Sequence, residues 1–184
     1  MKQPLNIFWF RRDLRLKDNT GLWHALSAGL PVLPIFIFDT NILQKLENRA
    51  DRRVTFIHEA LQEMQEQLRD HESSLQVYTG NPAEIFSKIC TQYEVNSVFT
   101  NTDYEPYAIE RDEAVKALLE IKKITFPSFK DHVIFEKNEV VKDDGKPYTV
   151  FTPYSRKWRS VFSDADIKPR LSEKLAGNYF TTKP

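Results

Sequence analysis

Cysteine is nearly absent from this sequence, since Cys90 is the only one in 184 residues. A single thiol excludes an internal disulfide and is typical of a protein kept in a reducing compartment. No apolar run reaches the length of a membrane span, and no signal peptide is visible at the start of the chain. We therefore predict a cytoplasmic protein that does not bind a membrane.

Glycine is scarce as well, with five in the chain, and neither GxxxxGK[ST] nor GxGxxG occurs. These two absences exclude a P-loop and a standard dinucleotide-binding fingerprint. The chain also lacks an excess of either charge, because 26 Lys and Arg balance 26 Asp and Glu. Binding to nucleic acid would therefore have to depend on a local patch or on another domain.

Metal-ligand and nucleophile motifs are missing too. The four histidines are scattered and have no Cys or His partner at metal-ligand spacing, so we predict no metal site. No Gly-x-Ser-x-Gly and no Cys–His arrangement indicates a nucleophile. Cys90 lies on the apolar side of a predicted helix and is expected to be a small core residue. We predict no catalytic residue within this chain.

The most informative stretch runs from Asn6 to Asn19. It begins as an apolar run of strand length and then turns into a charged loop. Asp18, Asn19 and Thr20 follow as a helix N-cap signal. Strand, charged loop and helix form the first half of a βαβ unit, and ligands bind at the carboxyl ends of strands in open α/β sheets.

The same alternation repeats along the chain. Apolar runs of strand length alternate with helical periodicity, and the connections are long enough to cross over a sheet. We predict an α/β fold with a doubly wound, five-stranded parallel sheet flanked by helices on both faces. The predicted strands are residues 6–10, 31–38, 75–79, 97–100 and 124–126, and the predicted helices are 22–30, 51–71, 83–93 and 107–122.

Beyond Pro127 the pattern changes. Short extended pieces at 132–135, 139–141 and 148–151 flank a turn at 143–146, and Thr152 or Ser155 is expected to cap a last helix. From Ser163 the chain is polar without a sustained period. We therefore expect residues 1–130 to form the domain core, 131–162 a closing hairpin-like segment and helix, and 163–184 the start of an interdomain linker.

Polar residues follow three of the predicted strands. Because the carboxyl ends of parallel strands crowd one edge of the sheet, these loops define the expected ligand crevice. Aromatic residues beside charged ones suit a flat, polar, conjugated ligand. The alternative is that the charges pair with one another and cap helices. The loop residues are Arg11, Arg12, Asp13 and Arg15; Phe38 and Asp39; and Asn101, Asp103 and Glu105, with Arg52 and Arg53 on the next helix.

Three segments carry a resemblance to a known family. Residues 9–19 resemble the N-terminal signature of the DNA photolyase and cryptochrome family. Residues 101–112 look like the family's Asn-x-x-Tyr-Glu-Pro loop and the helix after it, and residues 148–159 are similar to the segment that ends its α/β domain. The sequence is identified on these motifs as a member of that family.

The resemblance implies an N-terminal α/β domain that can hold a light-harvesting antenna chromophore. It also implies a larger C-terminal helical domain, absent from this chain, that binds FAD and binds DNA containing pyrimidine dimers. Photolyases use light to drive an electron from reduced flavin into the dimer, which splits. This chain alone is then expected to be inactive, with its own helical domain as partner, and the full-length protein is expected to be a monomer.

Site residues are carried over by the same resemblance. Members that bind a deazaflavin resemble this chain at Phe38, Arg53, Asp103 and Glu105, and Asp39, Arg11 and Arg12 complete the predicted cofactor-binding set. In folate-binding members an Asn-Glu pair contacts the pterin, and here Tyr107 and Ala108 stand at those positions. Deazaflavin or FMN is therefore favoured over folate as the antenna chromophore, and an empty pocket remains an alternative.

Two other functions compete with repair. A cryptochrome that senses blue light without repairing DNA shares these motifs, because the residues that would decide lie around the flavin in the absent domain. A stand-alone nucleotide-binding module of related fold is the third alternative. It is disfavoured because the chain has no phosphate-binding glycine loop. Asp13 is further expected to pair with Arg12 or Arg15 and hold the turn.

Overall fold

A parallel five-stranded sheet organises the protein in the computed structural model, which describes residues 2–48 and 50–182. The strand order is β3-β2-β1-β4-β5, and every pairing between neighbouring strands is parallel. The predicted doubly wound α/β fold is confirmed. The strands are β1 (Pro4–Phe10), β2 (Val32–Asp39), β3 (Gln76–Gly80), β4 (Glu94–Asn101) and β5 (Ser128–Phe129).

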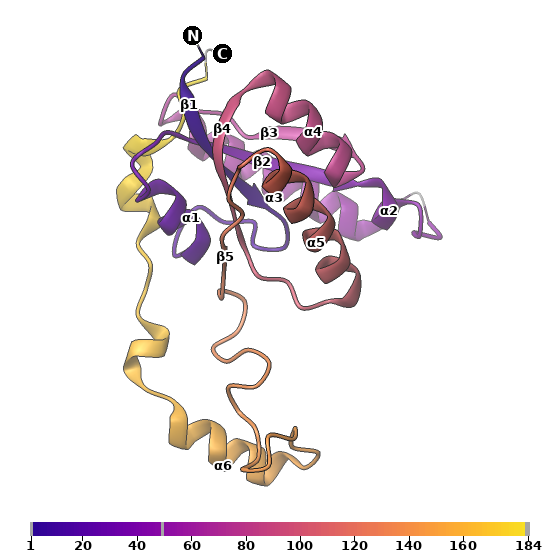
Figure 1. The fold of residues 1–184 in the computed structure, drawn as a ribbon, viewed down its shortest axis with the longest axis vertical. Helices are drawn as coiled ribbons and strands as arrows, with labels where there is room; N and C mark the ends of the chain where they lie inside the picture. The colour runs from indigo at the N-terminus through magenta and orange to yellow at the C-terminus, as the bar shows by residue number, and fades with distance from the viewer. Residues whose placement is uncertain (1, 49, 183–184) are drawn as a thin grey trace.

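Helices cover both faces of the sheet (Figure 1). Alternation along β1 sends Phe8 and Phe10 to one face, against α1 (Thr20–Leu26) and α3 (Arg52–Arg69). Ile7 and Trp9 point to the other face, against α4 (Pro82–Gln92) and α5 (Pro106–Ile121). Burial on both faces explains why β1 and β2 are continuous apolar runs rather than alternating ones.

The helix starts follow from local chemistry. The side chain of Asn19 accepts a hydrogen bond from Leu22 N at the start of α1, as its N-cap position predicts. Asn81 caps α4 in the same way, with Pro82 at the first helical position. Asp51 caps α3. A short helix, α2 (Thr40–Leu43), follows β2 directly.

The fifth strand lies later in the chain than predicted. Residues 124–126 form only an isolated bridge, Ser97 to Thr125, and β5 is Ser128–Phe129. Backbone N–H groups of β4 and the residue after it donate to the carbonyls of Thr125, Pro127 and Phe129. Because Pro127 has no N–H to donate in return, the ladder is interrupted between the two pieces.

The predicted hairpin-like segment is wrong in its strands. The turn exists, since Lys142 N donates to Lys146 O at 2.9 Å and Gly145 has φ +79°. However, none of the described residues between 130 and 150 belongs to a strand, because no sheet edge lies beside them to pair with. The last helix, α6, is Phe151–Val161, so it starts before the predicted caps Thr152 and Ser155.

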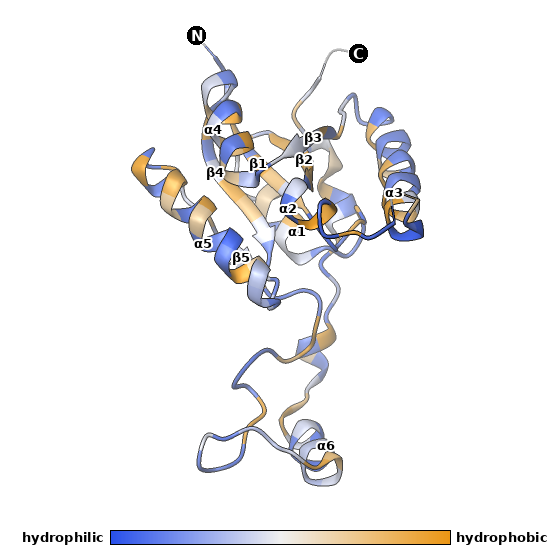
Figure 2. Ribbon diagram, turned by 90° about the vertical axis from the view of Figure 1, so that its right-hand side faces the viewer, coloured by the Kyte–Doolittle hydropathy of each residue, from blue (hydrophilic) through white to orange (hydrophobic). Residues whose placement is uncertain are grey.

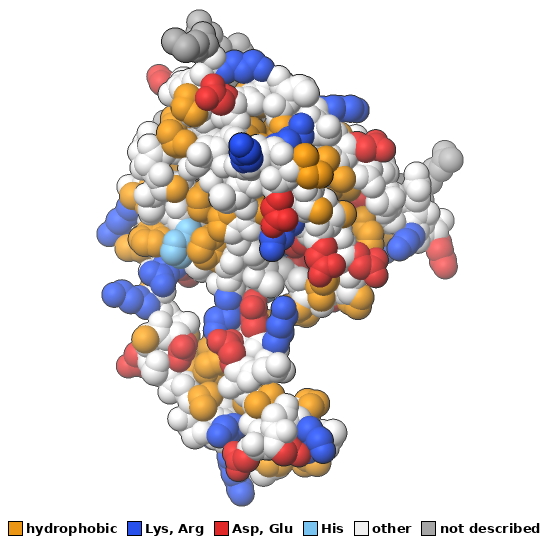
Figure 3. Space-filling model, in the orientation of Figure 1, with side chains coloured by type: hydrophobic (Ala, Val, Ile, Leu, Met, Phe, Trp, Pro, Cys, Tyr) orange, Lys and Arg blue, Asp and Glu red, His pale blue; other side chains and the backbone are white. Residues whose placement is uncertain are grey.

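Residues 131–171, which we call the arm, extend away from the sheet and return (Figures 1 and 2). Its helix α6 has no buried residue. Stacking between aromatic side chains, such as Trp158 and Phe162 with 5.1 Å between ring centroids, stabilises it locally. Figure 3 shows hydrophobic side chains at the far end of the arm, where Phe151 is 78% exposed. The arm also contains a 3-10 helix, η1 (Asp164–Ile167).

The chain then returns to the sheet, although its polar composition predicted a linker from Ser163. A second 3-10 helix, η2 (Ser172–Asn178), packs beside α1, and Ala176 and Tyr179 are buried. Phe180 N donates to Val32 O at 2.8 Å, and burial raises the pKa of Tyr179. A few apolar residues are enough to dock this segment, and its role as a linker in a longer protein stays a prediction.

Candidate functional site

A cavity of about 580 Å³ opens at the carboxyl ends of β1, β2 and β4, and we call it the strand-end cavity. It adjoins the point where the strand order reverses, between β1 and β4, which is the usual ligand position in open α/β sheets. Its volume falls in the range of small-molecule sites. All seven predicted cofactor-binding residues line it: Arg11, Arg12, Phe38, Asp39, Arg53, Asp103 and Glu105.

A buried amide and carboxylate network holds the β1–α1 loop beneath this cavity. Asn101 Nδ2 donates to Asp13 Oδ2 at 2.6 Å and to Asn19 Oδ1 at 2.8 Å. Arg11 N and Asn19 Nδ2 also donate to the Asp13 carboxylate, at 3.0 and 3.3 Å. Asp13 therefore does hold the turn, but through amides rather than through the predicted pairs with Arg12 or Arg15.

Gly21 completes this network. Its N–H donates to Asn101 Oδ1 at 2.8 Å. A Cβ at this position would lie 2.6 Å from the same oxygen and 2.9 Å from the Phe8 ring. Only glycine lets α1 approach β4 so closely.

Arg11 is held within the protein. Its Nη1 donates to both carboxylate oxygens of Asp112, at 2.6 and 2.5 Å, and its Nη2 donates to Asn101 O. The side chain is 5% exposed, and burial lowers the pKa of Arg11 while the Asp112 carboxylate opposes that shift. These bonds position the guanidinium at the wall of the strand-end cavity and use most of its donors.

Arg12, its neighbour, behaves differently. Its side chain is 54% exposed, and Nη1 lies 3.4 Å from Asp103 Oδ1 and 3.5 Å from Glu105 Oε1. Asp103 is 6% exposed, whereas Glu105 is 57% exposed. The charges of Arg12 and Glu105 are therefore loosely paired and accessible to a ligand, whereas the Asp103 carboxylate is buried.

Asp39 and Tyr107 form a second polar pair. Tyr107 Oη donates to Asp39 Oδ2 at 2.6 Å and accepts from Asn41 Nδ2 at 3.1 Å. Burial, together with the hydrogen bond to Asp39, raises the pKa of the Tyr107 phenol. The phenol therefore stays protonated near neutral pH and donates a hydrogen bond to the Asp39 carboxylate.

Arg53 lines the mouth of the cavity from the first turn of α3. Its side chain is 75% exposed and bonds to Asp51, the N-cap, with Nη2 2.6 Å from Oδ2. These hydrogen bonds lower the pKa of Asp51 to about 2. Arg53 thus lies at the site as predicted, but its nearest carboxylate is its own helix cap.

The remaining wall is apolar. Phe38 packs edge-on to Phe36 with 5.0 Å between ring centroids, and Ile57 of α3 lies across from them. Trp9, 1% exposed, forms the base, with the guanidinium carbons of Arg11 and Arg111 5.1 and 5.0 Å from its ring. Aromatic surface beside paired charges suits a planar heterocycle with polar edges.

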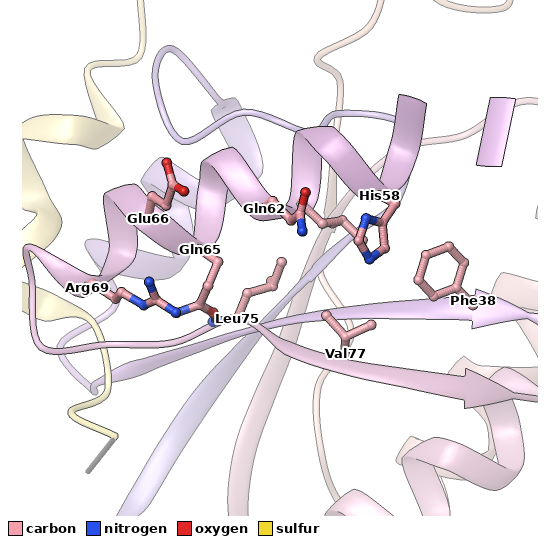
Figure 4. Close-up of a pocket in the computed structure, with 9 residues that line it drawn as sticks. Phe38, His58, Gln62, Gln65, Glu66, Arg69, Leu75 and Val77 are labelled. Carbon is pink, nitrogen blue, oxygen red and sulfur yellow. Dashed lines mark hydrogen bonds between the residues drawn. The ribbon is translucent and has the colours of Figure 1, made fainter. Parts of the chain in front are cut away.

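A second cavity, of about 420 Å³, lies between α3 and β3 (Figure 4). Figure 4 shows Phe38 and His58 at one end and Arg69 at the other. Of the seven predicted residues only Phe38 lines it, and Gln65 uses its carbonyl oxygen to accept from Leu75 N at 2.8 Å. It lies along the sheet edge rather than at the strand ends, so we do not take it as the site.

Four residues of α5 that line the strand-end cavity or support it were not in the predicted set. Tyr107, Ala108 and Arg111 line the cavity from α5, and Asp112 anchors Arg11. Spacings of three and four along a helix place residues 107, 108 and 111 on one face. That periodicity could have identified the cavity-lining face of α5, but nothing local indicates that Asp112 reaches Arg11.

Two kinds of feature, metal-ligand clusters and membrane-spanning helices, are absent from the described residues. No group of three or more His, Cys, Asp or Glu side chains in residues 2–48 and 50–182 converges as a metal site would require. Over the same part of the chain, none of the helices has the length and apolar character needed to cross a membrane.

Comparison with known proteins decides the family. A sequence model described as DNA photolyase matches residues 6–173. The chain belongs to the DNA photolyase family. A deoxyribodipyrimidine photo-lyase of a Synechococcus species is 32% identical over 160 residues, which cover 87% of this chain and 33% of that protein. The resemblance inferred from the three motifs is thereby confirmed.

The relatives include both photolyases and a cryptochrome. Cryptochrome-1 of Drosophila melanogaster is 32% identical over 146 residues, covering 76% of this chain and 27% of that protein. The crystal structure of a photolyase from Sulfolobus tokodaii superposes with a TM-score of 0.66 at 34% identity, over 74% of this chain and 31% of that one. This photolyase-family chain spans about a third of the length of these relatives.

Proposed function

We propose that this chain is the antenna-chromophore domain of a light-driven DNA repair photolyase, and that the strand-end cavity holds the chromophore. The observation that carries the proposal is that all seven residues predicted from the sequence line one cavity at the strand ends. Repair of pyrimidine dimers with FAD, and contact with DNA, would belong to a helical domain in the longer protein. The single cysteine is consistent with a cytoplasmic location.

The cavity favours a flavin-like ring over a folate. The Tyr107 hydroxyl donates a hydrogen bond to Asp39, and Ala108 has no polar side-chain atom. A pterin would therefore lack the amide and carboxylate that folate-binding relatives are expected to offer at these positions. The Sulfolobus tokodaii photolyase structure is described as containing two FAD molecules and implicating a novel light-harvesting cofactor, so FAD is a candidate beside deazaflavin and FMN.

The test is a parallel fluorescence titration of the chain with deazaflavin, FMN, FAD and folate. We expect saturable binding of at least one of the first three and weaker binding of folate. The double variant Arg53→Ala, Glu105→Ala is expected to weaken binding by roughly tenfold or more, since two charge-assisted contacts are removed. Arg69→Ala, in the other cavity, is the matched control. Binding unchanged in the double variant would contradict the assignment of these residues.

A cryptochrome remains the competing function, since a cryptochrome relative matches most of this chain. Repair can be tested directly in the full-length protein by illuminating DNA that contains pyrimidine dimers and measuring their loss. Loss of the dimers, with the separate pyrimidines restored, would establish a photolyase. Photoreduction of FAD without any loss of dimers would favour the sensor.

A further inference from the structure

A third hollow, also of about 580 Å³, adjoins the strand-end cavity. It shares Arg11, Arg12, Arg53 and Ile57 with that cavity. We call it the arginine annex, because the described residues that line it are four arginines and three apolar residues. The residues that it adds are Leu14, Arg52 and Phe56.

Charge differs between these two adjoining hollows. Three carboxylates, those of Asp39, Asp103 and Glu105, line the strand-end cavity. None of the described residues that line the annex is acidic. A ligand that occupies both parts would therefore meet mixed charges at one end and an excess of positive charge at the other.

Three of the four arginines of the annex keep unused donors. Arg52 is exposed and forms no ion pair with any described residue. Arg12 is 3.4 Å or more from its nearest carboxylates. Arg53 bonds to Asp51 through Nε and Nη2, which leaves Nη1 available. An anion could therefore bind here without displacing a buried ion pair.

The position of Arg52 is unfavourable for the helix itself. It occupies the first turn of α3, which contains no acidic residue, and the N-cap carboxylate of Asp51 is bonded to Arg53. Cations at a helix N-terminus oppose the helix dipole, whereas an anion there is stabilised by it. A local choice that disfavours the helix is expected where function requires it.

We propose that the arginine annex binds the phosphate of a flavin nucleotide whose ring occupies the strand-end cavity. This inference rests on the proposed function and narrows it, because riboflavin and a bare deazaflavin have no phosphate to place there. A phosphate monoester carries close to two negative charges at neutral pH and accepts several hydrogen bonds. Arginine matches that geometry with paired N–H donors.

The experiment titrates the chain with riboflavin, FMN and FAD at low and high salt, by quenching of flavin fluorescence. At low salt we expect FMN to bind about tenfold more tightly than riboflavin, as one retained charge-assisted contact implies. High salt should weaken FMN binding and leave riboflavin binding unchanged, because only the former depends on exposed charges.

Arg52→Gln is the decisive variant, since Arg52 lines the annex but not the strand-end cavity. We expect it to weaken FMN and FAD binding about fivefold and to leave riboflavin binding unchanged. Arg69→Gln, at the opposite end of the same helix, is the matched control (Figure 4). Thermal unfolding should show that Arg52→Gln is at least as stable as the parent, because a cation leaves the helix N-terminus.

The outcomes separate the two proposals. Equal affinity for riboflavin and FMN, unchanged by Arg52→Gln, would overturn the annex assignment and leave the chromophore cavity intact. Failure of every flavin and deazaflavin to bind would overturn both proposals together.

Discussion

Arg11 and Arg12 are neighbours in the sequence and line the same cavity, yet their surroundings have little in common. Arg11 belongs to what we call the floor, with Asp13, Asn19 and Asn101, where every group is buried and bonded within the protein. Arg12 belongs to the rim, with Arg53 and Glu105, where side chains are more than half exposed.

The difference shows how one charged motif serves two purposes. A buried polar group must be fully bonded, because leaving it unsatisfied costs free energy. The floor therefore maintains the shape of the loop and has few donors left for a ligand. Exposed ion pairs contribute little to stability, so rim residues can exchange protein partners for ligand partners at low cost.

The largest expected effect is the loss of stability when a residue of the floor is substituted. Asp13→Ala removes the acceptor of Arg11 N, Asn19 Nδ2 and Asn101 Nδ2. We expect a loss of about 3 kcal/mol in the free energy of unfolding, since several buried donors lose their partner. Urea unfolding followed by circular dichroism measures it, with Asp144→Ala in the exposed turn as control. Equal and small losses in both variants would refute the distinction between floor and rim.

The next largest effect is the difference in stability loss between Arg11→Ala and Arg12→Ala. Arg11→Ala leaves the Asp112 carboxylate without its principal partner and should destabilise the fold by about 2 kcal/mol. Arg12→Ala should cost less than about 1 kcal/mol, as exposed pairs do. Chromophore titration of the same variants should show weakened binding for Arg12→Ala. Similar stability losses for both variants would contradict the structure around Arg11.

A smaller effect concerns Tyr107, whose side chain is less buried than the floor and less exposed than the rim. Tyr107→Phe removes the hydrogen bond to Asp39 and should cost about 1 kcal/mol at neutral pH. Since the pKa of Tyr107 is raised in the folded protein, its contribution is complete below the ordinary tyrosine value of about 10 and is lost as pH rises beyond it. The stability difference between parent and variant should therefore shrink in alkaline solution. If the stability difference between parent and variant instead grew above pH 10, the pKa of Tyr107 would be lowered rather than raised in the folded protein.

The smallest effect is at the helix cap. Asp51→Ser keeps a side chain that can cap α3 but removes the carboxylate that Arg53 contacts. The unfolding midpoint should change little, whereas FMN affinity should rise about twofold, because Arg53 gains freedom to bind the phosphate. Weaker FMN binding in this variant would show that Asp51 positions Arg53 for the ligand rather than competing with it.

The sequence predicted the α/β alternation because burial on both faces makes parallel strands continuous apolar runs. It also predicted which loops meet, since strand direction places all carboxyl ends at one edge of the sheet. It did not predict where β5 pairs, because that depends on which carbonyls of 125–129 reach β4. The strands predicted in the arm do not form for the same reason. A strand needs the edge of another strand to pair with, and local propensity does not supply one.

By itself, then, the sequence determined the fold class, the helix cap at Asn19, and the group of residues at the strand ends. Only the tertiary structure decided which of those charges are structural. Arg11 meets Asp112 across 101 positions in the chain, and Asp13 meets Asn101 across 88. Such contacts depend on how a helix and a strand pack, and no local pattern encodes them. The division between floor and rim therefore arises from packing.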